Sequence, residues 1–230
     1  MDRPRTGRRY ATPADDAVKR RVAGFVIAAF CWPSGVAEAQ FGAPRGEPPK
    51  IVVISSDRND PRLALVDEAV SFWNRTFEEL GSEYRLGTVT RITRPIPEQA
   101  LQSLSHAVVD AHRWPAYVPL ALRDLPGDLT ILLGESEFVS FAGPFDVASK
   151  GVVGIRGKDF PPMNLPNVAR NVIAHEIGHA LGLGHSGDPS TLMCGRPAGC
   201  RPALFRSDEP KFFPLTVDEK RQLLALHPAP

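Results

Sequence analysis

The stretch of sequence that decides the fold is His175-Glu-Ile-Gly-His179-Ala-Leu-Gly182-Leu-Gly-His185. Residues four apart lie one above the other on a helix, so His175 and His179 can point both imidazoles at one metal ion. Glycine enters the left-handed region without steric cost, so Gly182 can end the helix and turn the chain back. His185 then completes a set of three nitrogen ligands.

Three protein ligands predict a catalytic metal ion rather than a structural one. Zinc prefers four ligands, so His175, His179 and His185 leave one position for water. Zinc lowers the pKa of such a water and polarises a carbonyl oxygen. Glu176 lies one step round the helix, beside the metal, where it can take the water's proton as general base and pass it to the leaving amine. We therefore expect one catalytic zinc ion, with Glu176 as the catalytic residue.

Two other interpretations of the motif stay open. The apolar residues Ile173, Ile177, Ala180 and Leu181 follow the spacing of a buried amphipathic helix, in which the histidines would be incidental. Three of the six histidines fall at ligand spacing beside a glutamate, however, which disfavours this interpretation. A second interpretation keeps the metal and drops catalysis, and the presence of Glu176 disfavours it.

The motif resembles that of the metzincin zinc proteases, which also carry a methionine turn beneath the metal. Here Ser190-Thr-Leu-Met193 follows His185 by eight residues. Ser186, directly after the third histidine, resembles the matrixins, the family of the matrix metalloproteinases; astacins would have Glu there, serralysins Pro and reprolysins Asp. The resemblance covers roughly residues 167–194, with weaker support from residues 214–227.

This resemblance implies an α+β fold: a single domain with a twisted mixed β-sheet, a long backing helix, a zinc-binding helix and a C-terminal helix. It implies a secreted zinc endopeptidase that hydrolyses peptide bonds of proteins. Met193 would support the metal site by packing, and Gly182 would form the turn. Substrate would pair with an edge strand before the zinc helix, formed by residues 138–141 or 151–155. The alternative is a zinc-dependent peptide-binding or self-processing protein with little general turnover.

The chain departs from the matrixin pattern in ways that bear on latency and on further metals. No cysteine stands between the N-terminal segment and the zinc motif, so the propeptide cysteine that caps zinc in many relatives is missing. The remaining histidines form no cluster for a second, structural zinc. Relatives often bind structural calcium, but no aspartate-rich loop of this sequence demands Ca²⁺.

The N-terminal residues read as a secretory signal peptide. Three basic residues at 19–21 precede an apolar run from Val22 to Trp32, and Ala37-Glu-Ala39 matches an A-x-A cleavage site. Eleven apolar residues are too few for a permanent membrane anchor. We therefore expect a signal peptide with an extended basic region at 1–39, a Pro/Gly-rich tail at 40–49 and the catalytic domain at 50–230, secreted or periplasmic after cleavage near Ala39. A short core helix or interfacial segment is the alternative.

Two cysteines remain after such cleavage, Cys194 and Cys200, because Cys31 leaves with the leader. An even pair in a secreted chain predicts a disulfide, which would pin the loop after Met193 that forms a wall of the substrate pocket in relatives. Two free thiols are the alternative.

Charge and composition restrict the partners. Residues 1–39 hold seven Lys/Arg and four Asp/Glu, so the remainder carries a formal charge of −2. Nothing in that balance favours nucleic acid or a membrane surface. We expect a peptide or protein substrate and a monomer.

Hydrophobic periodicity and capping signals predict the other elements. A clean three–four spacing of apolar residues, after Asp60-Pro61, predicts a long helix up to Gly81. Thr216 and Glu219 form a capping box that opens the last helix. The other predicted helices cover 97–111 and 166–181, and the first of these is expected to be an insertion relative to a minimal matrixin domain. Predicted strands cover 50–56, 85–93 and 129–133.

Overall fold

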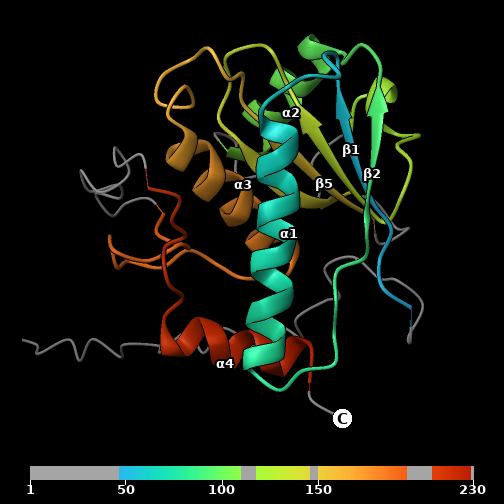
Figure 1. Ribbon diagram of the computed structural model, residues 1–230. Helices are drawn as coiled ribbons and strands as arrows, with labels where there is room; N and C mark the ends of the chain where they lie inside the picture. Colours follow the sequence, from blue (N-terminus) through green and yellow to red (C-terminus); the bar gives the residue numbers. More distant parts are fainter. Residues whose placement is uncertain (1–46, 110–117, 146–149, 196–208, 229–230) are drawn as a thin grey trace, which may run out of the picture. The chain divides into compact units, whose positions relative to one another are not determined.

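In the part of the chain that the structure describes, five strands form one mixed β-sheet in the order β2-β1-β3-β5-β4 (Figure 1). Strands β1, β2, β3 and β5 are parallel, and β4 runs antiparallel to β5. Their bounds in this computed structural model are β1 Ile51–Ser55, β2 Val89–Thr93, β3 Leu129–Leu133, β4 Phe141–Phe145 and β5 Lys150–Ile155. The structure describes residues 47–109, 118–145, 150–195 and 209–228; the predicted leader lies outside them.

In these described ranges, four α-helices and one 3-10 turn accompany the sheet. Their bounds are α1 Arg62–Glu79, α2 Glu98–Val109, η1 Leu120–Leu122, α3 Pro166–Ala180 and α4 Val217–Leu226. The predicted α+β architecture is thereby confirmed, with its mixed sheet, long helix α1, zinc-motif helix α3 and C-terminal helix α4. Helix α2 lies within the helix predicted at 97–111, and Thr216 and Glu219 do form the capping box of α4.

The alternation of side chains along the strands produces two hydrophobic cores. Ile51 and Val53 of β1 face the helices α1 and α3, and Val52 and Ile54 face α2 on the other side. Strand β3 divides its residues in the same way. Because both faces of the central strands are buried, they read as continuous apolar runs.

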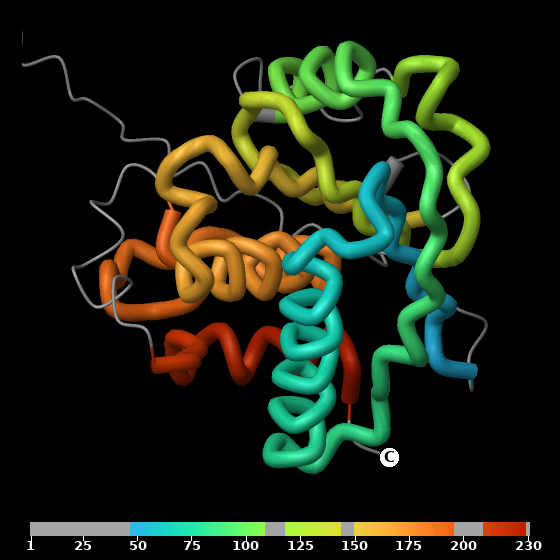
Figure 2. Tube along the Cα trace, turned by 45° about the horizontal axis from the view of Figure 1, so that its top comes forward, coloured from blue at the N-terminus to red at the C-terminus, as the bar shows by residue number. Residues whose placement is uncertain are grey.

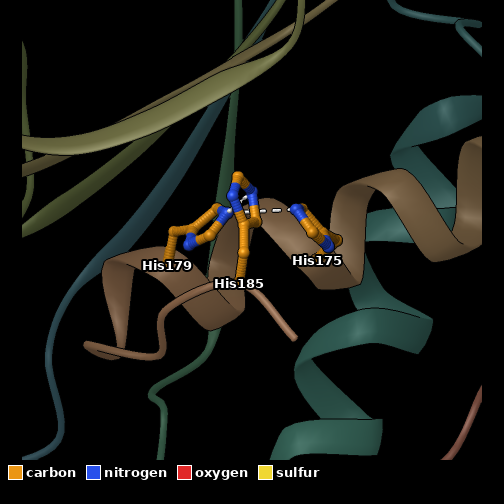
Figure 3. A group of neighbouring side chains, drawn as sticks. All are labelled: His175, His179 and His185. Atoms are coloured by element: carbon orange, nitrogen blue, oxygen red, sulfur yellow. Dashed lines mark hydrogen bonds between the residues drawn. The ribbon is translucent and has the colours of Figure 1, made fainter. Parts of the chain in front are cut away.

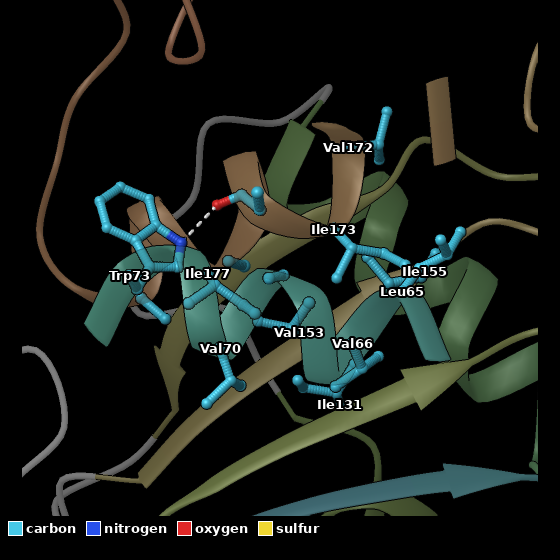
Figure 4. Packing of buried hydrophobic residues seen from close by; sticks show 14 of the residues in the cluster. Leu65, Val66, Val70, Trp73, Ile131, Val153, Ile155, Val172, Ile173 and Ile177 are labelled. Carbon is cyan, nitrogen blue, oxygen red and sulfur yellow. Dashed lines mark hydrogen bonds between the residues drawn. The ribbon is translucent and has the colours of Figure 1, made fainter. Parts of the chain in front are cut away.

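Helix α3 is fixed by contacts with α1 and with the β4–β5 end of the sheet. Figures 1 and 2 both show α1 and α3 side by side. The indole of Trp73, on α1, is fully buried and its Nε1 donates to the carbonyl oxygen of Ala174, on α3, at 3.0 Å (Figure 4). Pro166 begins α3, where a missing N–H costs nothing, and Gly182 follows its end with φ of +97°.

A buried ion pair ties the start of α1 to the ends of two strands. The guanidinium of Arg62 lies 2.6 Å from the carboxylate of Asp60, and both side chains are almost fully buried. Arg62 also donates to the carbonyl oxygens of Gly134 and Arg156, which follow β3 and β5. Burial alone would raise the pKa of Asp60, but the hydrogen bonds and charge of Arg62 outweigh it and hold that pKa below its usual value.

The sheet decides which of the two candidate strands is an edge. Strand β5 lies between β3 and β4, so residues 151–155 cannot pair with a substrate. Strand β4 is the edge strand. The predicted strand at 138–141 is wrong in its bounds, because β4 begins only at Phe141. Phe138 packs instead into the core beneath α2, and the hydroxyl of Ser140 accepts the Arg156 N–H at 3.1 Å.

The strand predicted from residue 85 also begins later, at Val89. The main chain of Leu86 pairs with the side-chain amide of Asn74 on α1 instead of with a neighbouring strand. The Asn74 Oδ1 accepts the Leu86 N–H at 2.7 Å, and its Nδ2 donates to the Leu86 carbonyl at 3.0 Å. Among the helices that the structure describes, none is long and apolar enough to cross a membrane.

Candidate metal centre

The three motif histidines converge on one point (Figure 3). His175 and His179 project from α3, and His185 comes from the segment after the Gly182 turn. The Nε2 atom of His179 lies 3.0 Å from Nε2 of His175 and 3.0 Å from Nε2 of His185. Ligands about 2.05 Å from a tetrahedral zinc ion lie about 3.3 Å apart. The observed spacing is therefore close to that of a zinc site.

Main-chain carbonyls fix the orientation of two of these rings. Nδ1 of His175 lies 2.8 Å from the Leu192 oxygen, and Nδ1 of His179 lies 2.8 Å from the Leu183 oxygen. A carbonyl only accepts, so each Nδ1 carries the hydrogen and a neutral ring presents a lone pair at Nε2. Burial lowers the pKa of His179 to about 4 and also lowers that of His185. Neutral imidazoles with converging lone pairs fit Zn²⁺.

Glu176 and Met193, the other two residues that the motif singles out, are both buried. Glu176 follows His175 on α3 and is 6% exposed. Met193 is fully buried and packs on α3, where a Cβ placed on Gly178 would lie 2.6 Å from its sulfur. Met193 thus packs against the helix that carries His175 and His179, and its support of a metal site stays a prediction.

Two main-chain hydrogen bonds join the residue after His185, the third motif histidine, to the methionine turn. Ser186, directly after His185, donates its N–H to the Met193 carbonyl at 2.7 Å, and Gly195 donates to the Ser186 carbonyl at 3.1 Å. The same turn provides Leu192, whose carbonyl orients His175. The position of Met193 and the positions of two ligands therefore depend on one another.

Helix α4 holds the turn between the second and third ligands. Gln222 Nε2 donates to the Gly182 carbonyl at 2.8 Å, and Nε2 of His227 lies 3.3 Å from the Leu181 carbonyl. Burial lowers the pKa of His227, so the neutral ring can donate through Nε2. The C-terminal segment thus stabilises the carbonyls that α3 leaves free at its end.

Two asparagines of α3 hold the segment that follows residues 196–208. Asn171 Nδ2 donates to the Lys211 carbonyl at 2.7 Å and its Oδ1 accepts the Phe213 N–H at 2.9 Å. Asn167 Nδ2 donates to the Glu209 carbonyl at 2.6 Å. The two side chains thereby pair with an extended segment at one end of the predicted pocket wall.

Several of these residues were not predicted from the sequence. Leu183 and Leu192 act through main-chain carbonyls, which no residue pattern reveals. Asn167 and Asn171 have helical four-residue spacing, a weak signal of a shared partner. Cys200 lies outside the described residues, so its disulfide with Cys194 stays a prediction. In the described ranges, the three histidines form the one group of three or more His, Cys, Asp or Glu residues placed to hold a metal.

Comparison with known proteins places this site in a class. The family model of the matrixins matches residues 155–203, which include α3, all three histidines and Met193. The chain is 29% identical to human matrix metalloproteinase-20 over 172 residues, or 63% of this chain. It spans 32% of the length of that relative. In the segment that carries the three histidines, the chain is therefore similar in sequence to the matrixins.

Among solved structures, the crystal structure of archaemetzincin from Methanopyrus kandleri is similar with a TM-score of 0.48 and 21% sequence identity. The similarity covers 80% of this chain and 98% of that protein.

Proposed function

We propose that this protein is a zinc-dependent endopeptidase of matrixin type. The observation that carries the proposal is the convergence of three Nε2 atoms on a segment that matches the matrixin model, with the buried Glu176 directly after His175 in the sequence. His175, His179 and His185 would hold the ion. Bound there, zinc supplies an acidified water and polarises the scissile carbonyl.

Glu176 supplies the proton transfer in this proposal. Glu176 follows His175 in the motif and is not one of the three histidine ligands, so in this proposal its carboxylate would accept a proton from the attacking water and deliver it to the leaving amine. Its burial places this transfer away from bulk water. The carbonyls of Leu183 and Leu192 keep the rings of His179 and His175 aimed at one point while the proton moves.

The free edge of β4 offers the binding surface for an extended peptide. Gly151 N–H bonds to Asp128, before β3, and the Ile155 carbonyl accepts from Gly134, after β3. Alternate residues of a strand turn their polar main-chain groups to opposite sides, so Val152 and Gly154 face β4.

The β4 partners of these residues are Gly143 and Phe141, which pair with Val152 and Gly154. Ala142 lies between them, so its N–H and carbonyl point to the open edge. Pro144 faces the same way but has no N–H, so within β4 Ala142 is the donor on this edge. We propose that substrate pairs with the main chain of Ala142 next to the zinc helix, which packs against β4.

The first test is metal content and peptidase activity of the same protein sample. About one zinc per chain, with cleavage of an unstructured protein that stops on chelation and returns with zinc, is the expected result. Folded protein that binds no zinc would overturn the proposal. Bound zinc without cleavage would shift the assignment to the alternative, a peptide-binding or self-processing protein.

The variant Glu176→Ala separates catalysis from binding. It should abolish cleavage and keep zinc and peptide binding, because the carboxylate is not a ligand. General acid–base residues contribute about 10²- to 10⁴-fold to rate. Unchanged cleavage in this variant would remove Glu176 from the mechanism.

We also propose export of the protein, from the basic and apolar pattern before Ala39. The expected outcome is that residues 1–45 direct a fused reporter across the membrane, with cleavage near Ala39. The same pattern with Lys19, Arg20 and Arg21 changed to Glu serves as the control. A reporter that stays inside the cell with its N-terminal segment intact would contradict this proposal.

A further inference from the structure

The third ligand differs from the other two in what orients its ring. His175 and His179 each donate from Nδ1 to a main-chain carbonyl. Within the part of the chain that the structure describes, Nδ1 of His185 has no hydrogen-bond partner. His185 is also the most exposed of the three residues. Among the described residues, packing rather than a hydrogen bond is therefore what can fix the plane of its ring.

The main chain of Gly195 lies against that ring. A Cβ on Gly195 would overlap Cγ and Cδ2 of His185 and would lie 2.5 Å from Nδ1. Carbon atoms in contact normally lie about 3.5–4.0 Å apart. Any residue other than glycine at position 195 would therefore have to displace either the imidazole or the main chain.

The main chain has little freedom to move. Gly195 donates to the Ser186 carbonyl at 3.1 Å, and Ser186 donates to the Met193 carbonyl at 2.7 Å. Met193 is fully buried against α3. The exposed imidazole of His185 is the part that would give way, and its Nε2 would then leave the position 3.0 Å from Nε2 of His179.

We propose that Gly195 is a positioning residue of the metal centre: its bare main chain seats the His185 ring, as the carbonyls of Leu183 and Leu192 seat the other two. This inference rests on the proposed zinc site. It also places the start of the predicted pocket-wall loop in contact with a ligand, so a change in that loop at residue 195 would act on the metal.

Two nearby glycines provide matched controls. Gly184 and Gly187 flank His185 on the same segment, and a Cβ on either would meet no atom within 4 Å. Neither has a positive φ. The variants Gly184→Ala and Gly187→Ala add the same methyl group to the same loop without contact with the ring.

The experiment measures zinc affinity by chelator competition for wild type, Gly195→Ala and the two controls. Loss of an outer contact to a ligand typically lowers metal affinity about 10- to 100-fold, and we expect such a loss for Gly195→Ala alone. The absorption spectrum of the Co²⁺-substituted protein should change in the same variant. Wild-type affinity and spectrum in Gly195→Ala would overturn the inference.

A second background keeps the test decisive if Gly195→Ala folds poorly. The variant His185→Ala removes the ring that the new methyl group would meet. In that background, adding Gly195→Ala should leave the unfolding temperature of the zinc-free protein unchanged. An equal loss in both backgrounds would show that residue 195 acts on the main chain and not on the ligand. If the unmodified protein binds no zinc, the result counts against the proposed function. If the unmodified protein binds zinc and Gly195→Ala binds it equally well, the result counts against this inference alone.

Discussion

Met193 packs against Gly178, so the methionine turn touches the zinc-motif helix at a position that has no side chain. A Cβ on Gly178 would lie 2.6 Å from the Met193 sulfur and 2.9 Å from Cζ2 of Trp73. Both large side chains are fully buried. The motif position between Ile177 and His179 is therefore restricted by packing as well as by helix geometry.

The variant Gly178→Ala should destabilise the fold despite its better helix propensity. Alanine gains about 1 kcal/mol over glycine within a helix, but overpacking a rigid core costs about 1–3 kcal/mol. Trp73 cannot yield, because its Nε1 is bonded to Ala174. Urea unfolding of the zinc-free protein measures the change, with Gly184→Ala as the control. A Gly178→Ala protein as stable as wild type would contradict this packing.

The buried pair Asp60–Arg62 should matter far more than the exposed pair Asp67–Arg91. Asp60→Asn leaves a buried guanidinium without its counter-charge, which costs about 3–5 kcal/mol. Asp67→Asn breaks an ion pair whose side chains are about half exposed, and such pairs contribute about 0–1 kcal/mol. Denaturant unfolding at neutral pH compares the two variants. Similar losses in both would contradict the structural role given to Arg62.

The pH dependence of the same pair follows from the direction of the pKa shift. The folded pKa of Asp60 lies below its unfolded value of about 3.8. The stability that it contributes is therefore present above pH 3.8 and is lost as the pH falls through the folded pKa. We expect the stability difference between wild type and Asp60→Asn to be constant from pH 7 to pH 5 and to shrink below pH 3.8. A difference that grows on acidification would contradict the sign of the shift.

The hydrogen bonds of Asn171 to the segment at residues 211–213 should contribute to the free energy of unfolding. Asn171→Leu keeps the volume but leaves the Phe213 N–H and the Lys211 carbonyl without their partner. Each buried unsatisfied group costs about 1–3 kcal/mol, so we expect a loss of about 2–4 kcal/mol in unfolding experiments. Asn164→Leu, at an exposed position, is the control. Equal stability of the two variants would show that the segment after residue 208 is held in some other way.

The sequence was sufficient to predict features that carry a periodic or local signal. The apolar stripe of α1, the ligand spacing on α3 and the capping box at Thr216 all depend on contacts within a few residues. Two other contacts of the site could not be predicted in this way: that of Gly195 with His185, and that of the Leu192 carbonyl with His175. Each joins residues that are distant in the sequence, and each depends on the conformation of the folded loop. The start of β4 was misplaced for the same reason, since Phe138 is apolar but packs beneath α2 rather than extending the strand.

The edge of β4 gives a prediction specific to substrate binding. Ala142→Pro removes the N–H that faces the open edge, and it should leave pairing with β5 intact because Ala142 does not bond to that strand. Loss of one hydrogen bond of about 0.5–1.5 kcal/mol should raise KM about two- to thirteenfold, with little change in zinc affinity. Ala142→Gly, which keeps the N–H, is the control for the buried side chain. An unchanged KM in Ala142→Pro would exclude β4 as the substrate-pairing strand, whereas an equal rise in both variants would assign the effect to packing.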